Sequence, residues 1–117
     1  MKYLILAYGR SEDWQKLTKS EQQSLLAQDD VLRNRGDFVA AVNPTATTVR
    51  AWDGTPTTIT GPFADSKAPL AGFGIIEAAD LNEAIRLVTN TPCARAGGAV
   101  EIRPIDQFNE ASIKRKQ

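Results

Sequence analysis

The chain has 117 residues, a length that usually forms one domain with its own hydrophobic core. Apolar residues make up 42% of the chain and charged residues 24%, as in folded globular proteins rather than disordered ones. Fourteen basic and fourteen acidic side chains cancel, which argues against a nucleic-acid partner or a membrane surface. No apolar run approaches the ~18 residues of a membrane span.

Two residue counts restrict the chemistry of any site. The chain has no histidine and one cysteine, Cys93. Sites built on a catalytic or metal-ligating histidine are therefore excluded, and acid–base chemistry must come from carboxylates, Lys, Tyr, the thiol or an external cofactor. We expect no metal and no cofactor. The single cysteine excludes an internal disulfide and favours a cytoplasmic location. With no adjacent base, Cys93 is interpreted as a small buried apolar residue.

The first predicted elements are a strand and a helix. Residues 2–8 are apolar on both faces, which predicts a central strand covered on both sides. Residues 10–17 are mostly polar and predict a loop or one helical turn. Thr18 and Glu21 then form a capping box for a helix over residues 19–35. The side chains expected to face inwards from this helix are Leu25, Leu26 and Leu32.

The middle of the chain predicts a hairpin. After a strand over residues 38–42, two threonine-rich strands over 47–52 and 55–60 flank Asp53 and Gly54. Asp-Gly is the favoured pair for a type I′ turn, in which both residues have positive φ. The remaining predicted elements are a strand over 70–77 with Gly72 and Gly74 on one face, a helix from Asp80 that Pro92 ends, a strand over 100–103 and a short helix from Phe108.

In chain order these elements form β-α-β-(β-hairpin)-β-α-β, which predicts a ferredoxin-like split βαβ arrangement of the α+β class. Each helix connects two strands, so we expect a four-stranded antiparallel sheet with both helices on one face. The hairpin is an insertion between the two halves. We expect one domain over residues 1–105 and a tail over 106–117, whose basic cluster at 114–116 is interpreted as solvated.

The best-defined local feature is the segment of residues 61–67, with the sequence GPFADSK. One interpretation is a structural loop: Asp65 caps backbone amides, Lys67 is solvated and Phe63 fills the core. The alternative places Asp65 and Lys67 at the mouth of a pocket, as a carboxylate and a cation that orient a polar ligand.

Other candidate ligand-binding residues lie near strand ends. Tyr8 and Trp14 flank Arg10 after the first strand, and aromatic side chains with an arginine suit an aromatic or anionic ligand; Trp14 as a lid over the core is the alternative. Arg95 is a candidate for a polar site between subunits. Gly72 and Gly74 allow close approach of a helix, a partner subunit or a ligand.

A set of segments along the chain is distinctive in combination: residues 3–9, 48–50, 53–54, 61–67, 72–73 and 92–95 and the final VEIRP of residues 100–104. Taken together, these segments resemble the YCII-related family, and within it the branch named for a D-G-P-F-A-E-T-K-E motif. The chain departs from that motif at Thr60, at Asp65 and Ser66, and at Ala68.

The resemblance implies a ferredoxin-like domain that pairs into a dimeric α/β barrel, with a ligand cleft between the sheet and its partner. It implies no assigned activity for the branch. The first functional hypothesis is therefore a homodimeric small-molecule-binding or accessory module with a cleft near residues 61–67. The alternative is a small cofactor-poor enzyme of lyase, isomerase or dehalogenase type that acts on an aromatic or acidic compound, with Asp65 as its base and Arg10 or Arg95 orienting an anion. A further alternative, from the family alone, is a regulatory partner of a sigma factor.

Overall fold

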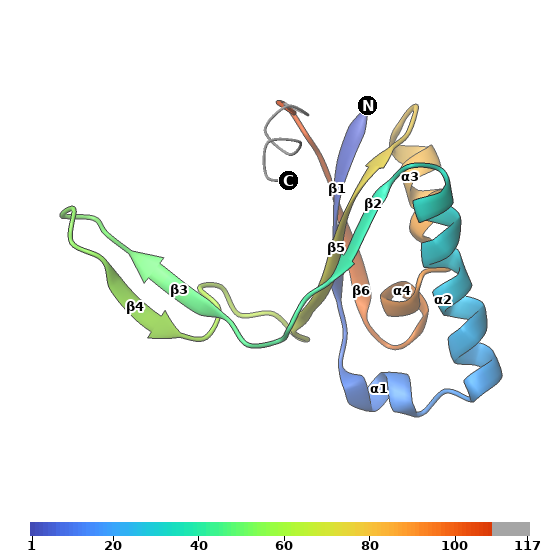
Figure 1. The fold of residues 1–117 in the computed structure, drawn as a ribbon, viewed down its shortest axis with the longest axis horizontal. Coiled ribbons are helices and arrows are strands. Elements are labelled where there is room, and N and C mark those ends of the chain that lie inside the picture. The colour runs from blue at the N-terminus through green and yellow to red at the C-terminus, as the bar shows by residue number, and fades with distance from the viewer. Residues whose placement is uncertain (109–117) are drawn as a thin grey trace.

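A four-stranded antiparallel sheet forms the centre of the molecule (Figure 1). The computed structural model describes residues 1–108, and its strands lie in the order β2-β5-β1-β6. β1 (Lys2–Tyr8) and β5 (Leu70–Glu77) are central, and β2 (Phe38–Ala41) and β6 (Ala99–Pro104) form the edges. β2 and β1 both run antiparallel to β5, which separates them. This is the predicted split βαβ arrangement.

The helices of the first half begin where the sequence indicates. α1 (Ser11–Gln15) is the single helical turn that follows β1. α2 (Lys19–Asn34) starts at the predicted capping box, in which the backbone N–H of Glu21 donates to Thr18 Oγ1 at 3.1 Å and the N–H of Thr18 donates to Glu21 Oε1 at 2.8 Å. Both bonds satisfy amides that the first helical turn leaves without partners.

The helices of the second half differ from the prediction at Pro92. α3 (Leu81–Val88) is capped by Asp80 and ends well before that proline. Pro92 instead begins a separate short helix, α4 (Pro92–Arg95), at a position where the missing N–H costs nothing. All four helices lie on the same side of the sheet (Figure 1), which confirms that prediction. No helix within residues 1–108 is both long and apolar enough to cross a membrane.

The inserted hairpin is present, but its turn was predicted wrongly. β3 (Thr47–Arg50) and β4 (Thr57–Thr60) form a separate two-stranded sheet that projects away on the side opposite the helices (Figure 1). Residues 51–56 connect the strands, and only Gly54 has a positive φ, of 88°. Asp53 Oδ1 accepts a hydrogen bond from the N–H of Thr55 at 3.0 Å. Pro56 has no N–H with which to extend the ladder, so the hairpin opens before the Asp-Gly pair.

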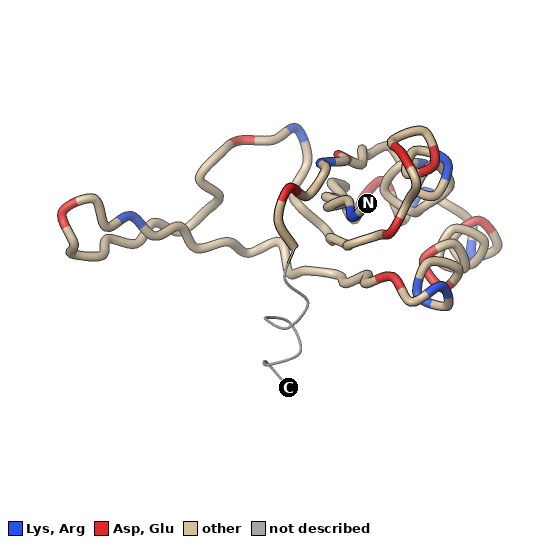
Figure 2. Tube along the Cα trace, turned by 90° about the horizontal axis from the view of Figure 1, so that it is seen from above, with Lys and Arg blue, Asp and Glu red and all other residues tan. Residues whose placement is uncertain are grey.

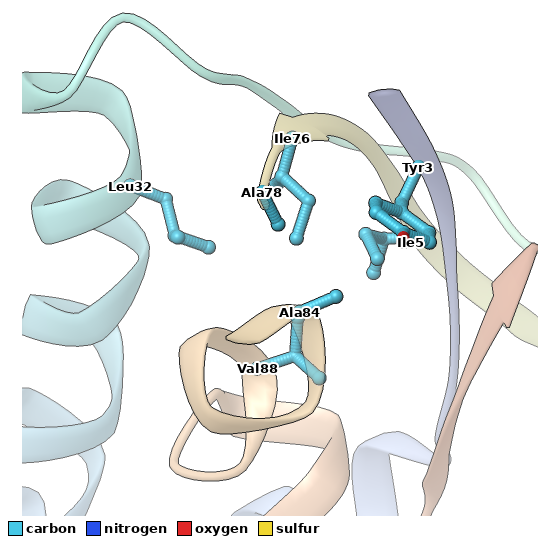
Figure 3. Packing of buried hydrophobic residues seen from close by; sticks show 7 residues of the cluster. All are labelled: Tyr3, Ile5, Leu32, Ile76, Ala78, Ala84 and Val88. Carbon is cyan, nitrogen blue, oxygen red and sulfur yellow. The ribbon is translucent and has the colours of Figure 1, made fainter. Parts of the chain in front are cut away.

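The core lies between α3 and the sheet (Figure 3). Ala84 and Val88 from α3 are 0% and 5% exposed, and Ile76 beneath them is 1% exposed. The glycines of β5 allow the neighbouring strand to lie close, because a Cβ at Gly74 would lie 2.7 Å from the carbonyl oxygen of Phe38 on β2. The group that approaches these glycines closely is therefore the backbone of β2. The remaining members of the cluster are Tyr3, Ile5, Leu32 and Ala78.

Only one face of the sheet is covered by helices within residues 1–108, so the prediction that β1 is covered on both sides is wrong for the single chain. The opposite face, hereafter the open face, carries apolar side chains from β2 and β5. The rings of Phe38 and Phe73 pack there with centroids 5.4 Å apart, and Phe38 is 48% exposed. The helix predicted from Phe108 onward lies, apart from Phe108 itself, outside the described residues.

Candidate functional site

An apolar cavity of about 820 Å³ lies between α2 and the helix face of the sheet. Small residues from three strands form its floor: Ala7 of β1, Ala41 of β2, and Gly72 with Gly74 of β5. Side chains of this size do not fill the layer between a sheet and a helix, so α2 covers a hollow rather than a packed core. The larger apolar side chains around it include Ile5, Leu26, Leu32, Val39, Ile76 and Val88.

One carboxyl group belongs to the wall of this cavity. Asp29 lies on α2 and is half-buried. Burial raises the pKa of the Asp29 carboxyl above its usual value, because an apolar surrounding disfavours the charged form. The positive charge of Arg33, one turn later, opposes this rise in pKa, and the negative charge of Asp30 adds to it. Arg33 also lines the cavity and forms an ion pair with Asp30 at 3.0 Å.

A thiol lines the same cavity. Cys93, from α4, is half-buried, and a Cβ at Gly9 would lie 3.1 Å from its Sγ atom. Burial raises the pKa of the Cys93 thiol, and the negative charge of Asp29 raises it further. The thiol therefore stays protonated at neutral pH, as expected for a cysteine without an activating base.

Two of the ligand-binding candidates from the sequence line the cavity. Arg10 and Trp14 come from the end of β1 and from α1, which together close one end of the hollow. The Arg10 guanidinium donates a hydrogen bond to the carbonyl oxygen of Lys67. The GPFADSK segment therefore contacts the cavity wall indirectly, because its Lys67 carbonyl binds Arg10, which lines the cavity.

The other candidates lie outside this cavity in the single chain. Asp65 and Lys67 are exposed, and Phe63 is 72% exposed with the guanidinium carbon of Arg50 5.3 Å from its ring centroid. Phe63 therefore does not fill the core, as one interpretation of the segment required. Tyr8 pairs with Leu70 and Ala99 in the sheet. Arg95 lines a separate, more polar hollow of about 510 Å³ and donates to Asn90 Oδ1 at 2.7 Å.

The sequence interpretation missed Asp29, although a signal was present. Leu25, Asp29 and Leu32 are spaced i, i+4 and i+7, which places the carboxylate on the inward face of the helix. A charged residue on an apolar face is the informative observation in such a pattern. Of the leucines predicted to face inwards, Leu32 is buried, Leu25 is half-buried and Leu26 lines the cavity while 49% exposed.

Charges of both signs alternate over the helices, whereas the projecting hairpin is nearly uncharged (Figure 2). Within residues 1–108, no group of three or more His, Cys, Asp or Glu side chains converges as a metal site would require. The polar side chains that line the cavity are two arginines, two carboxylates, two hydroxyls and one thiol: Arg10, Arg33, Glu12, Asp29, Ser11, Thr91 and Cys93.

The sheet order and the hollow under α2 define a ferredoxin-like α+β domain with a ligand-sized cavity. Residues 1–109 match the YCII-related domain, and the chain belongs to that family. An uncharacterized protein of Rhizobium meliloti (strain 1021) is 29% identical over 122 residues, which cover 97% of this chain and 98% of the relative.

Among solved structures, one that is similar covers most of this chain. It is 5-chloro-2-hydroxyhydroquinone dehydrochlorinase from Burkholderia phenoliruptrix AC1100 in complex with 2,5-dihydroxybenzoquinone. The TM-score is 0.50 at 21% sequence identity, covering 95% of this chain and 98% of the other. At this identity the likeness establishes a shared fold.

Proposed function

We propose that this protein binds a small ring compound in the cavity beneath α2. The observation that carries the proposal is the cavity itself, whose volume of about 820 Å³ lies within the roughly 300–1,000 Å³ of ligand pockets. Its walls are mainly apolar, with a few polar groups that include Arg10, Asp29 and Arg33. That combination suits a flat apolar body that carries one or two oxygen substituents.

The ring compound in the dehydrochlorinase structure is a compound of this kind. 2,5-Dihydroxybenzoquinone is planar, and its oxygens would find hydrogen-bond partners in the arginine guanidinium groups and the carboxyl of Asp29. Because a shared fold does not imply a shared activity, the proposal rests on the cavity, and the compound serves as a probe.

Titration calorimetry with 2,5-dihydroxybenzoquinone and with 4-nitrophenol tests the proposal. We expect saturable one-site binding to the wild type. Ala7→Leu should abolish it, because Ala7 lies on the cavity floor and a leucine side chain there occupies the space. Ala79→Leu is the matched control, since Ala79 is exposed and outside the cavity. Equal binding by wild type and Ala7→Leu, or binding of neither probe, would contradict the proposal.

We further propose that two copies associate through their open faces. The support is apolar surface that residues 1–108 leave uncovered: Phe38 on the sheet, and Trp52 and Ile59 on the hairpin, which are 87% and 49% exposed. An isolated two-stranded hairpin is only marginally stable in water, so a contact with a second copy would stabilise it. The formal net charge is zero, so two copies do not repel each other through their overall charge.

Light scattering tests the dimer with two matched substitutions. Phe38 on the open face and Leu81 on α3 are 48% and 49% exposed, respectively. We expect a dimer for the wild type and for Leu81→Asp, and a monomer for Phe38→Asp. A wild-type monomer at every concentration would exclude both the dimer and the dimeric barrel.

We also propose that the chain belongs to the family branch with the D-G-P-F-A-E-T-K-E motif and that it is located in the cytoplasm. The GPFADSK segment of residues 61–67 supports the branch, and the single cysteine supports the location. Fractionation of the native cells, with detection of this chain in the cytoplasmic fraction, checks the location.

A further inference from the structure

We propose that Asp29 is the acid–base group of the cavity, and that it accepts the proton of an acidic ring hydroxyl on the bound compound. This inference rests on the proposed ligand-binding function and adds a substrate class and a proton acceptor to it. Asp65, which the sequence suggested as a base, is exposed and lies outside the cavity in the single chain.

The placement of Asp29 sets it apart from the other titratable groups around the cavity. On α2 itself, Asp30 faces solvent in an ion pair with Arg33. From the end of β1 and α1 come Arg10 and Glu12, which are both exposed. From α4 comes the thiol of Cys93, which its raised pKa keeps neutral. Asp29 is thus the half-buried carboxyl among the residues that line this hollow.

The electrostatics of the wall suit a proton exchange. The apolar surrounding raises the pKa of Asp29, and the guanidinium of Arg33 limits the rise. The group therefore ionises more readily than a fully buried acid, yet binds a proton more tightly than an exposed carboxylate. A proton acceptor is most effective when its pKa approaches that of the group it deprotonates.

The step conserves atoms and charge. The O–H bond of the ligand breaks, an O–H bond forms on a carboxylate oxygen of Asp29, and the electron pair remains on the ring oxygen. One negative charge thereby moves from Asp29 to the ligand, where Arg33 and Arg10 can stabilise it. An ordinary phenol, with a pKa of about 10, holds its proton too tightly. The suitable class is a ring hydroxyl acidified by a carbonyl or nitro group on the same ring, as in a hydroxyquinone or a nitrophenol.

Binding of 4-nitrophenol as a function of pH tests the inference, because its phenolate is coloured and its phenol is not. When Asp29 and the bound probe together hold one proton, that proton forms a hydrogen bond between them. When the pH exceeds the pKa of both groups, both carry a negative charge and repel each other. Wild-type affinity should therefore fall at least about tenfold as pH rises through the pKa of the probe, since one pK unit of coupling is tenfold.

The matched variants are Asp29→Asn and Asp30→Asn. Asparagine at position 29 cannot ionise, so this variant should keep or gain affinity for the phenolate, whereas Asp30→Asn should follow the wild type. Identical pH profiles for all three proteins overturn the inference while leaving ligand binding intact. Failure of all three to bind 4-nitrophenol also overturns it, and 2,5-dihydroxybenzoquinone then tests the proposed function separately.

A second measurement needs no substitution. The carboxyl carbon of Asp29 can be titrated by NMR in the wild type with and without 4-nitrophenol. We expect saturating probe to move the midpoint of that titration to higher pH, because a bound phenolate favours the protonated acid. An unchanged midpoint in the probe-saturated protein would overturn the inference even if Asp29→Asn fails to fold.

Discussion

Two helices cover the same face of one sheet in this protein, and they do so in different ways. α3 is eight residues long and buries Ala84 and Val88, whereas α2 is sixteen residues long and buries only Leu32. Small side chains lie under both helices. Under α3 the small residue is Ala84 of the helix itself, which lets the helix backbone approach Ile76 and close the core. Under α2 the small residues belong to the sheet, and nothing from the helix fills the space above them.

The difference separates stability from binding within one layer. The α3 half contains most of the buried apolar cluster, of which Ile76 and Val88 also border the cavity, so substitutions there should mainly change the free energy of unfolding. The α2 half holds the cavity and its carboxyl group, so substitutions there should change ligand binding with smaller effects on folding. Four predictions test this division, beginning with the largest expected effect.

The first prediction compares truncation of one branched aliphatic side chain in each half. Ile76→Ala should lower the free energy of unfolding by about 2–5 kcal/mol, because Ile76 belongs to the buried cluster, is 1% exposed, and its truncation enlarges the cavity that it borders. Leu26→Ala on α2 should cost less than about 1 kcal/mol, because Leu26 is already 49% exposed. Urea unfolding followed by circular dichroism measures both values. Equal losses would show that α2 packs as tightly as α3.

The second prediction compares enlargement at two alanines. Ala84 is 0% exposed, so Ala84→Leu should cost about 1–3 kcal/mol by overpacking. Ala7→Leu adds the same atoms where the cavity can accept them, and should change stability by less than about 1 kcal/mol while removing ligand binding. The same unfolding experiment, combined with calorimetric titration, provides both readouts. A large loss of stability in Ala7→Leu would mean that the cavity cannot accommodate the added atoms of the leucine side chain.

The starts of α2 and α3 could be predicted from the sequence because local chemistry determines them. Thr18 with Glu21, and Asp80 with Glu83, form cap interactions within a few residues of each other. The position of α4 and the hairpin turn could not be predicted in the same way. Pro92 is compatible both with a helix end and with a helix start, and the Asp-Gly signal was outweighed by the proline that follows at position 56.

The candidate site could be predicted only in part, because a cavity depends on what neighbouring elements fail to fill. The sequence indicated Arg10 and Trp14, which follow a strand end and line the hollow. It did not show that Asp65 would be exposed and outside the cavity, while the carbonyl of Lys67 two residues later holds Arg10. That relation depends on the long-range hydrogen bond between Arg10 and the carbonyl of Lys67, which no local pattern encodes.

The third prediction concerns the cap of α2. Because this helix buries little side-chain surface, its first turn relies on the capping box, and Thr18→Ala should cost about 1 kcal/mol. Ser20→Ala, two residues later and exposed, should change stability by no more than about 0.5 kcal/mol. Hydrogen exchange should show faster exchange of α2 amides in Thr18→Ala, with α3 amides unchanged. Equal acceleration in both helices would argue against independent fraying of α2.

The smallest expected effect is the pH dependence of stability at Asp29. Its carboxyl pKa is raised in the folded state, so the folded protein holds this proton more tightly than the unfolded chain, whose Asp pKa is about 3.9. The stabilisation is therefore complete below the unfolded pKa, and is lost as pH rises through the folded pKa. Asp29→Asn removes this loss, so its midpoint of thermal unfolding should exceed that of the wild type at neutral pH and approach it below pH about 4. Asp30→Asn, at an exposed position, should not reproduce that pattern. A difference between Asp29→Asn and wild type that persists at acidic pH would mean that the substitution acts through packing, and the carboxyl would then contribute nothing to the contrast between the two helices.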